Sequence, residues 1–107
     1  MLGKIVKVII DRPLGSTHPQ YKNIYYFVNY GYIPEVFASD GEEQDAYILG
    51  VNIPLTEFTG KVVAIIHRKN DNEDKWVIIP ENFNLSKEEI LKAVDFQEKY
   101  FDIEIEM

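Results

Sequence analysis

The chain has 107 residues, no cysteine and a formal net charge of −7. This length suits a single domain over residues 1–107 with a modest apolar core. The absence of cysteine excludes disulfides, thiolate catalysis and thiolate metal sites. The acidic balance argues against binding to a phosphate backbone, so we expect no nucleic-acid partner.

The N-terminal run MLGKIVKVII is apolar, but it is too short to cross a bilayer, and the acidic Asp11 follows it directly. We therefore expect neither a signal peptide nor a membrane helix. These features predict no membrane partner and a cytoplasmic location.

Five segments rich in β-branched and aromatic residues are predicted strands: 4–10, 23–33, 44–51, 61–67 and 75–80. Glycine, proline, asparagine and aspartate separate them. In the third segment Tyr47, Leu49 and Val51 lie on one face of the predicted strand and Ile48 lies on the other. This pattern predicts that part of the strand is covered on both sides.

The pattern changes after Pro80, where a helix is expected over residues 86–101. Ser86 followed three residues later by Glu89 is a capping box, and apolar residues then recur at helical spacing. Five strands and one late helix predict a mainly β fold, namely a five-stranded antiparallel barrel of the OB type with a C-terminal α-helix. A split sheet with the helix across it is the alternative. Side chains fill so small a barrel, so a site is expected at its mouth or on an outer face.

Two acidic turns lead into predicted strands. The first contains Asp40, Glu42, Glu43 and Asp45, and the second contains Asp71, Glu73 and Asp74. Each turn alone is typical of a solvated loop. Carboxylates from both turns around one opening would repel each other by several kcal/mol per pair at about 4 Å, and divalent cations would remove that repulsion. Oxygen ligands favour Mg²⁺ or Mn²⁺ over Zn²⁺.

Protein-bound Mg²⁺ usually also contacts phosphate oxygens, which basic groups help to neutralise. Basic residues lie nearby in the sequence. Arg12 is in the loop DRPLGSTHP, and Arg68, Lys69 and Lys75 flank the second acidic turn. Tyr30 and Tyr32 offer phenolic donors, or they pack in the core as aromatic residues. We expect His18 and His67 to have structural, hydrogen-bonded roles.

Five segments in chain order, DRPLGST, YYFVNYGYIP, DGEEQDAYILG, EDKWVIIP and FQEKYFDIEIE, resemble the soluble Mg²⁺-dependent inorganic pyrophosphatases of family I. NYGYIP followed closely by DGEEQDA is the specific combination. The resemblance is closest to a short branch of that family. It implies an OB-type barrel, hydrolysis of inorganic pyrophosphate to two phosphates, Mg²⁺ (or Mn²⁺) as the cofactor, and a homo-oligomer.

The resemblance also implies roles for individual residues. The metal-binding motif falls on Asp40, Gly41, Glu42 and Asp45, which makes Asp40 and Asp45 metal ligands and lets Glu42 help to activate the attacking water. The second acidic turn adds Asp71 and Asp74 as further metal ligands. The implied substrate-binding residues are Arg12, Tyr30, Lys75 and Tyr100, and the implied catalytic residues are Arg12, Tyr30, Glu42, Asp45 and Lys75.

Four departures from the family pattern predict a reduced or altered activity. Glu42 replaces an aspartate, Gln44 stands where the family has an apolar residue, Phe101 stands where it has a phosphate-contacting lysine, and the N-terminal region is much shorter than the family pattern. They leave two alternatives open. One is a barrel that serves as a binding or assembly module without turnover, and the other is a hydrolase of another phosphoanhydride or phosphoester.

Overall fold

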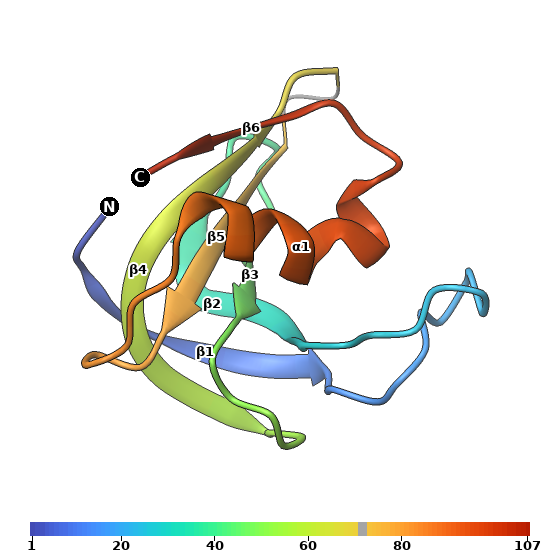
Figure 1. The fold of residues 1–107 in the computed structure, drawn as a ribbon, viewed down its shortest axis with the longest axis horizontal. Helices are drawn as coiled ribbons and strands as arrows, with labels where there is room; N and C mark the ends of the chain where they lie inside the picture. Colours follow the sequence, from blue (N-terminus) through green and yellow to red (C-terminus); the bar gives the residue numbers. More distant parts are fainter. Residues whose placement is uncertain (71–72) are drawn as a thin grey trace.

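The structure is a computed structural model that describes residues 1–70 and 73–107. The elements in these residues are β1 (Ile5–Arg12), β2 (Asn29–Phe37), β3 (Glu43–Ile48), β4 (Glu57–Arg68), β5 (Asp74–Ile79), α1 (Lys87–Glu98) and β6 (Ile103–Glu106). The strands neighbour each other in the order β1-β2-β3-β5-β4, and β4 also pairs with β1. This last pairing closes a five-stranded barrel, and α1 lies against its outside (Figure 1).

The predicted fold class is confirmed, and the structure adds detail to it. The pair β3–β5 is parallel, whereas the other pairs of the barrel are antiparallel. The strand predicted over residues 23–33 begins only at Asn29. Residues before it hydrogen-bond to the preceding loop instead, with the N–H of Tyr26 donating to the carbonyl of Ser16 at 2.8 Å. The predicted strand is therefore displaced because its first half pairs locally and not with the barrel.

Alternation along the strands creates two separate apolar layers. The layer inside the barrel contains Val8, Ile10, Ile33, Ala46, Ile48, Val62, Trp76 and Ile78. The layer outside it, under the helix, contains Tyr26, Tyr30, Tyr47, Leu49, Ile66, Val77, Ile79, Ile90 and Val94. Successive residues of β3 and β5 enter opposite layers, so both faces of these strands are buried, as predicted for the third strand. The same alternation directs the polar residues at the ends of these strands either to the inner or to the outer side of the barrel wall.

The helix begins and ends close to the expected residues. The side-chain oxygen of Ser86 accepts a hydrogen bond from the N–H of Glu89 at 3.2 Å, and the Glu89 carboxylate accepts one from the N–H of Ser86 at 2.9 Å. This capping box confirms the predicted N-terminus of α1. In the last turn Gln97 and Glu98 are buried, so the helix end carries polar groups into the interior.

Two residues of the NYGYIP segment shape the backbone beside the first tyrosine. A Cβ atom on Gly31 would lie 1.9 Å from the carbonyl oxygen of Ile9, so only glycine lets β1 and β2 approach this closely. The buried Asn29 accepts hydrogen bonds from the backbone N–H groups of Leu14 and Leu55, both at 3.0 Å. Asn29 and Gly31 are therefore structural residues.

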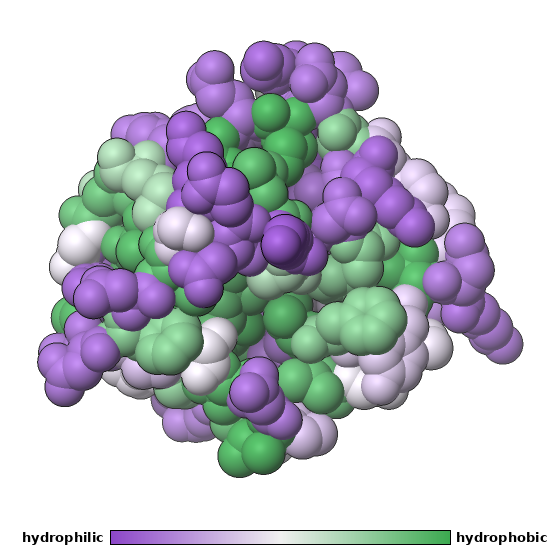
Figure 2. All heavy atoms as spheres, viewed as in Figure 1, coloured by the Kyte–Doolittle hydropathy of each residue, from purple (hydrophilic) through white to green (hydrophobic). Residues whose placement is uncertain are grey.

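The surface mixes hydrophilic and hydrophobic side chains over the face shown in Figure 2. Exposed apolar side chains are a normal part of protein surfaces and do not by themselves identify a partner. Across the described residues, no helix has the length and apolar character needed to cross a lipid bilayer.

Candidate active site

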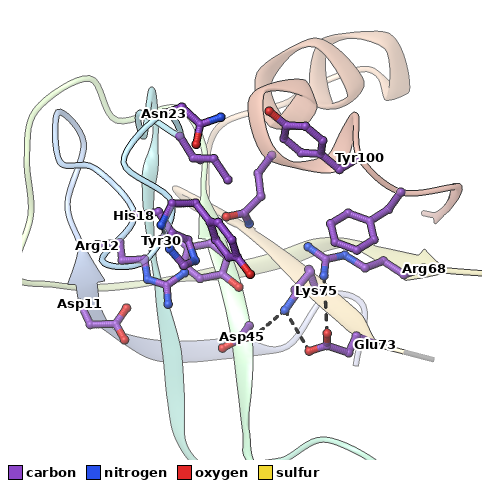
Figure 3. A pocket seen from close by; sticks show the side chains of 14 residues that line it. Asp11, Arg12, His18, Asn23, Tyr30, Asp45, Arg68, Glu73, Lys75 and Tyr100 are labelled. Carbon is purple, nitrogen blue, oxygen red and sulfur yellow. Dashed lines mark hydrogen bonds and ion pairs between the residues drawn. The ribbon is translucent and has the colours of Figure 1, made fainter. Parts of the chain in front are cut away.

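A cavity of about 610 Å³ opens on the outer face of the barrel, beside the last turn of α1 (Figure 3). Five of the predicted site residues line it: Arg12, Tyr30, Asp45, Lys75 and Tyr100. They come from four strands and from the segment after α1. The fold thus brings these five residues, distant in sequence, around one space.

Lys75 lines the cavity between two carboxylates. Its side chain is only 5% exposed, and its Nζ lies 2.6 Å from Oδ2 of Asp45 and 3.4 Å from Oε1 of Glu73. Glu73 and Lys75 are two residues apart in extended chain, so their side chains lie on the same side. The result is a buried ammonium group flanked by two partly exposed carboxylates.

In Figure 3, Arg12 and Tyr30 lie on one side of Lys75, and Glu73 lies on the other. Nη1 of Arg12 donates a hydrogen bond to the hydroxyl of Tyr26 at 2.8 Å, and its guanidinium carbon is 5.5 Å from the centre of the Tyr30 ring. Burial, followed by the nearby charge of Asp45, raises the pKa of Tyr30 well above its ordinary value. Tyr30 therefore stays a neutral phenol that can donate a hydrogen bond.

Asp74 points away from Lys75. Its Oδ1 lies 2.8 Å from Nδ1 of His67, and Nε2 of the same histidine lies 2.8 Å from Oε1 of Glu106. The hydrogen bond to Glu106 is the main cause that raises the pKa of His67, and Asp74 adds to it. These contacts join β4, β5 and β6, and they give His67 the structural role expected for it. Strand alternation leaves Glu73, and not Asp74, on the cavity side with Lys75.

The first acidic turn is exposed. Gly41, with φ at +86°, lies in this turn, and the N–H of Glu42 donates to Oδ1 of Asp40 at 3.0 Å. A small hollow of about 10 Å³ is lined by acidic residues of both turns: Asp40, Glu43, Asp45, Glu73 and Asp74. Asp45 and Glu73 also line the large cavity. Glu42 borders neither space in the described part of the chain.

These carboxylates are the type of oxygen donor that Mg²⁺ prefers, so the chemistry of the hollow fits the predicted cofactor. Within residues 1–70 and 73–107, however, no three aspartate, glutamate or histidine side chains converge as a metal cluster. Asp45 and Glu73 instead pair with Lys75, and Glu73 also pairs with Arg68 at 3.5 Å. The predicted ligand Asp71 lies outside the described residues.

Sequence reasoning assigned no role to several residues around the cavity. The sequence places Arg68 close to the second acidic turn, and it places Gln97 at a position on a helix face that is otherwise apolar. In the structure Gln97 accepts a hydrogen bond from the hydroxyl of Tyr26 and donates one to the hydroxyl of Tyr47 at 2.7 Å. A glutamine at an apolar position of a helix is the signal that points to such a buried network.

Residues 4–104 match the family model of inorganic pyrophosphatase. The chain belongs to the inorganic pyrophosphatase family. Membership confirms the resemblance on which the residue roles were carried over, and it supports the predicted enzyme class, an inorganic diphosphatase. No curated protein matches the chain.

Solved structures of inorganic pyrophosphatases share the fold of this pyrophosphatase family member. The protein from Ehrlichia chaffeensis has a TM-score of 0.74 at 17% identity, covering 99% of this chain and 87% of its own. The protein from Neisseria gonorrhoeae has a TM-score of 0.70 at 20% identity, covering 92% and 74%. The protein from Thermus thermophilus has a TM-score of 0.63 at 16% identity, covering 96% and 80%.

Proposed function

We propose that this chain hydrolyses inorganic pyrophosphate to two phosphates in a reaction that depends on Mg²⁺, with Mn²⁺ as the alternative metal. One observation carries the proposal: Arg12, Lys75, Tyr30, Tyr100 and Asp45 line a single cavity. Cations and phenols bind phosphate oxygens through charge-assisted hydrogen bonds. Neighbouring carboxylates are suited to hold a divalent cation that also contacts the phosphate.

The cationic side of the cavity would bind the substrate and the leaving phosphate. Lys75 presents its ammonium group from a buried stem, and Arg12 presents a guanidinium group whose direction is set by Tyr26. The neutral phenol of Tyr30 would donate a further hydrogen bond, and Tyr100 would contact the substrate from the helix side. Donors that are held in place before the reaction stabilise developing negative charge without reorganisation.

We propose Asp40, Asp45 and Glu73 as the residues that would hold Mg²⁺. All three border the hollow between the acidic turns. Glu73 takes the role that the resemblance implied for Asp74, because Glu73 borders both the hollow and the cavity, whereas Asp74 borders the hollow and contacts His67. When bound, Mg²⁺ supplies a water of lowered pKa and neutralises phosphate charge. Glu42 stays the predicted acceptor of the proton from the attacking water.

Phosphate release from pyrophosphate in the presence of Mg²⁺ tests the proposal. We expect Asp45→Asn to lower the rate by about a hundredfold, because it removes a charged ligand without changing the shape of the side chain. Asp95→Asn, on the exposed side of α1, is the matched control and should leave the rate unchanged. Equal rates for wild type and Asp45→Asn would remove Asp45 from the mechanism. No release by the wild type at any Mg²⁺ or Mn²⁺ concentration would refute the function.

A binding module without turnover is the second candidate. It is favoured by the exposed position of Glu42 outside the cavity and by the pairing of Asp45 with Lys75. Calorimetry with Mg²⁺ and a nonhydrolysable pyrophosphate analogue separates the two, since a module would bind the analogue and release no phosphate from pyrophosphate. A panel of other phosphoanhydrides and phosphoesters tests the remaining alternative. The cytoplasmic location and the homo-oligomer stay predictions.

A further inference from the structure

Arg68, the last residue of β4, forms part of the cavity wall. Its side chain is 6% exposed, and its guanidinium carbon lies 3.7 Å from the centre of the Phe101 ring. An arginine this deeply buried needs partners for its charge. Those partners decide which part of the guanidinium group is directed toward the cavity.

One edge of the guanidinium is held by the last turn of α1. Nε of Arg68 donates to Oε1 of Glu98 at 2.9 Å, and Nη2 donates to Oε2 at 2.7 Å. The Glu98 side chain is 1% exposed and also accepts a hydrogen bond from the hydroxyl of Tyr47 at 2.6 Å. This two-point contact fixes the plane of the guanidinium, because the arginine fork matches a carboxylate in only a few orientations.

The third nitrogen of the group is directed to the other side. Nη1 of Arg68 lies 3.5 Å from Oε2 of Glu73, which borders both the cavity and the acidic hollow. Figure 3 shows Arg12 and Arg68 on opposite sides of the cavity, with Lys75 between them. Cations on opposite sides of a cavity suit an anion with two charged ends, and a diphosphate is such an anion.

We propose that Arg68 is a substrate-binding residue whose Nη1 edge binds a phosphate group, while Glu98 holds the opposite edge. The choice of ligand rests on the proposed function, and the geometry of the buried pair does not. Burial lowers the pKa of Arg68, but the hydrogen bonds and charge of Glu98 outweigh this effect and raise it. Arg68 therefore keeps its positive charge throughout the pH range in which phosphate is an anion.

A purely structural role is the rival explanation, since the Arg68–Glu98 pair also joins α1 to β4. Removing only one partner would leave a buried charge and threaten folding. The decisive variant is therefore the double replacement Arg68→Gln with Glu98→Gln, which removes both charges and keeps polar side chains. Glu98→Gln alone keeps the cation, and its amide oxygen can still accept a hydrogen bond from Arg68, so it is the matched reference where it folds; the wild type is the reference where it does not. Lys92→Gln, on the exposed side of α1, controls for the loss of one positive charge.

Binding of inorganic phosphate in the presence of Mg²⁺ is measured by calorimetry, and the KM and kcat for pyrophosphate are measured on the same samples. We expect the double variant to bind phosphate about tenfold to a hundredfold more weakly than Glu98→Gln, with a matching rise in KM. Lys92→Gln should behave as the wild type. If the double variant does not fold, Arg68→Met with Glu98→Leu replaces it, because apolar residues of similar volume often substitute for a buried ion pair.

Three outcomes are separable. A folded double variant that binds phosphate as tightly as Glu98→Gln would overturn the proposal and leave the pair as a structural contact. A wild type that binds no phosphate would overturn it as well. A wild type that binds phosphate but releases none from pyrophosphate would refute the proposed hydrolysis, and the comparison of binding constants would still decide the role of Arg68.

Discussion

The cationic side and the acidic side of the candidate site are built in different ways. Lys75 and Arg68 are 5% and 6% exposed, and each donates hydrogen bonds to carboxylates that hold it in place. Asp40 and Glu42, by contrast, lie on an exposed turn that is held by two backbone hydrogen bonds and by one hydrogen bond from the N–H of Glu42 to Oδ1 of Asp40. The barrel and helix thus position the cations in advance, whereas the exposed carboxylates would be ordered by a bound cation. Four predictions test this difference, in order of expected effect.

The largest effect is expected from removing the carboxylate that pairs with the buried Arg68. Glu98→Ala leaves the buried Arg68 without its main partner, and we expect the free energy of unfolding to fall by about 3–5 kcal/mol. Urea denaturation measures it. Glu81→Ala, at an exposed position, should change stability little. If both variants unfolded at the same urea concentration, the cationic side would not be held by this pair.

The next prediction compares two neighbouring carboxylates at the start of β5, Glu73 just before the strand and Asp74 as its first residue. We expect Glu73→Gln to slow pyrophosphate hydrolysis by about a hundredfold and Asp74→Asn to leave the rate within about threefold. The reason is that Glu73 borders the cavity and contacts Lys75, while Asp74 contacts His67. Steady-state rates at saturating Mg²⁺ measure both. The reverse order would return the ligand role to Asp74.

A smaller effect is expected from the metal itself. Mg²⁺ at ten times its dissociation constant should stabilise the wild type by about 1.4 kcal/mol, because it binds only the folded acidic turns. Thermal melting with and without MgCl₂ measures this gain, which the double variant Asp40→Asn with Asp45→Asn should lose. NaCl at matched ionic strength controls for screening of the repelling carboxylates. An equal gain with NaCl would contradict a specific metal site.

The smallest effect concerns pH and the contacts of His67 with Asp74 and Glu106. Because these contacts raise the pKa of His67 in the folded state, their stabilisation is fully present below its ordinary value of about 6.5. It is lost as the pH rises through the raised value. The stability difference between wild type and His67→Gln should therefore be larger at about pH 5.5 than at about pH 8.5. His18→Gln should show no such gain in acid, because burial lowers the pKa of His18.

Much of the fold follows from local patterns in the sequence. Apolar alternation located the barrel strands approximately, and the Ser86–Glu89 pair located the start of the helix. The short strand β6 was missed, although its Ile-Glu-Ile-Glu pattern has the period of a strand. The displaced start of β2 could not be read from propensity, because residues 23–28 are rich in strand-forming side chains and pair with a loop.

The candidate site was predictable in part. The motifs shared with the family predicted the site residues Arg12, Tyr30, Asp45, Lys75 and Tyr100, and the structure brings these five to one cavity. Strand alternation alone could have favoured Glu73 over Asp74, since residues 73 and 75 share a side of an extended chain. The pair of Arg68 and Glu98 had no local signal, because the two residues are 30 positions apart and meet only through the packing of α1 on the barrel.

The strand β6 also bears on how copies of this chain could associate. It pairs with the last four residues of β4, a stretch of backbone that the barrel pairing with β1 leaves uncovered. The new outer edge is only four residues long and carries the exposed acids Glu104 and Glu106. Short, charged edges resist the addition of a strand from another molecule. If the chain assembles, its subunits should therefore meet through side-chain surfaces, and not through a sheet continued from one copy into the next at this edge.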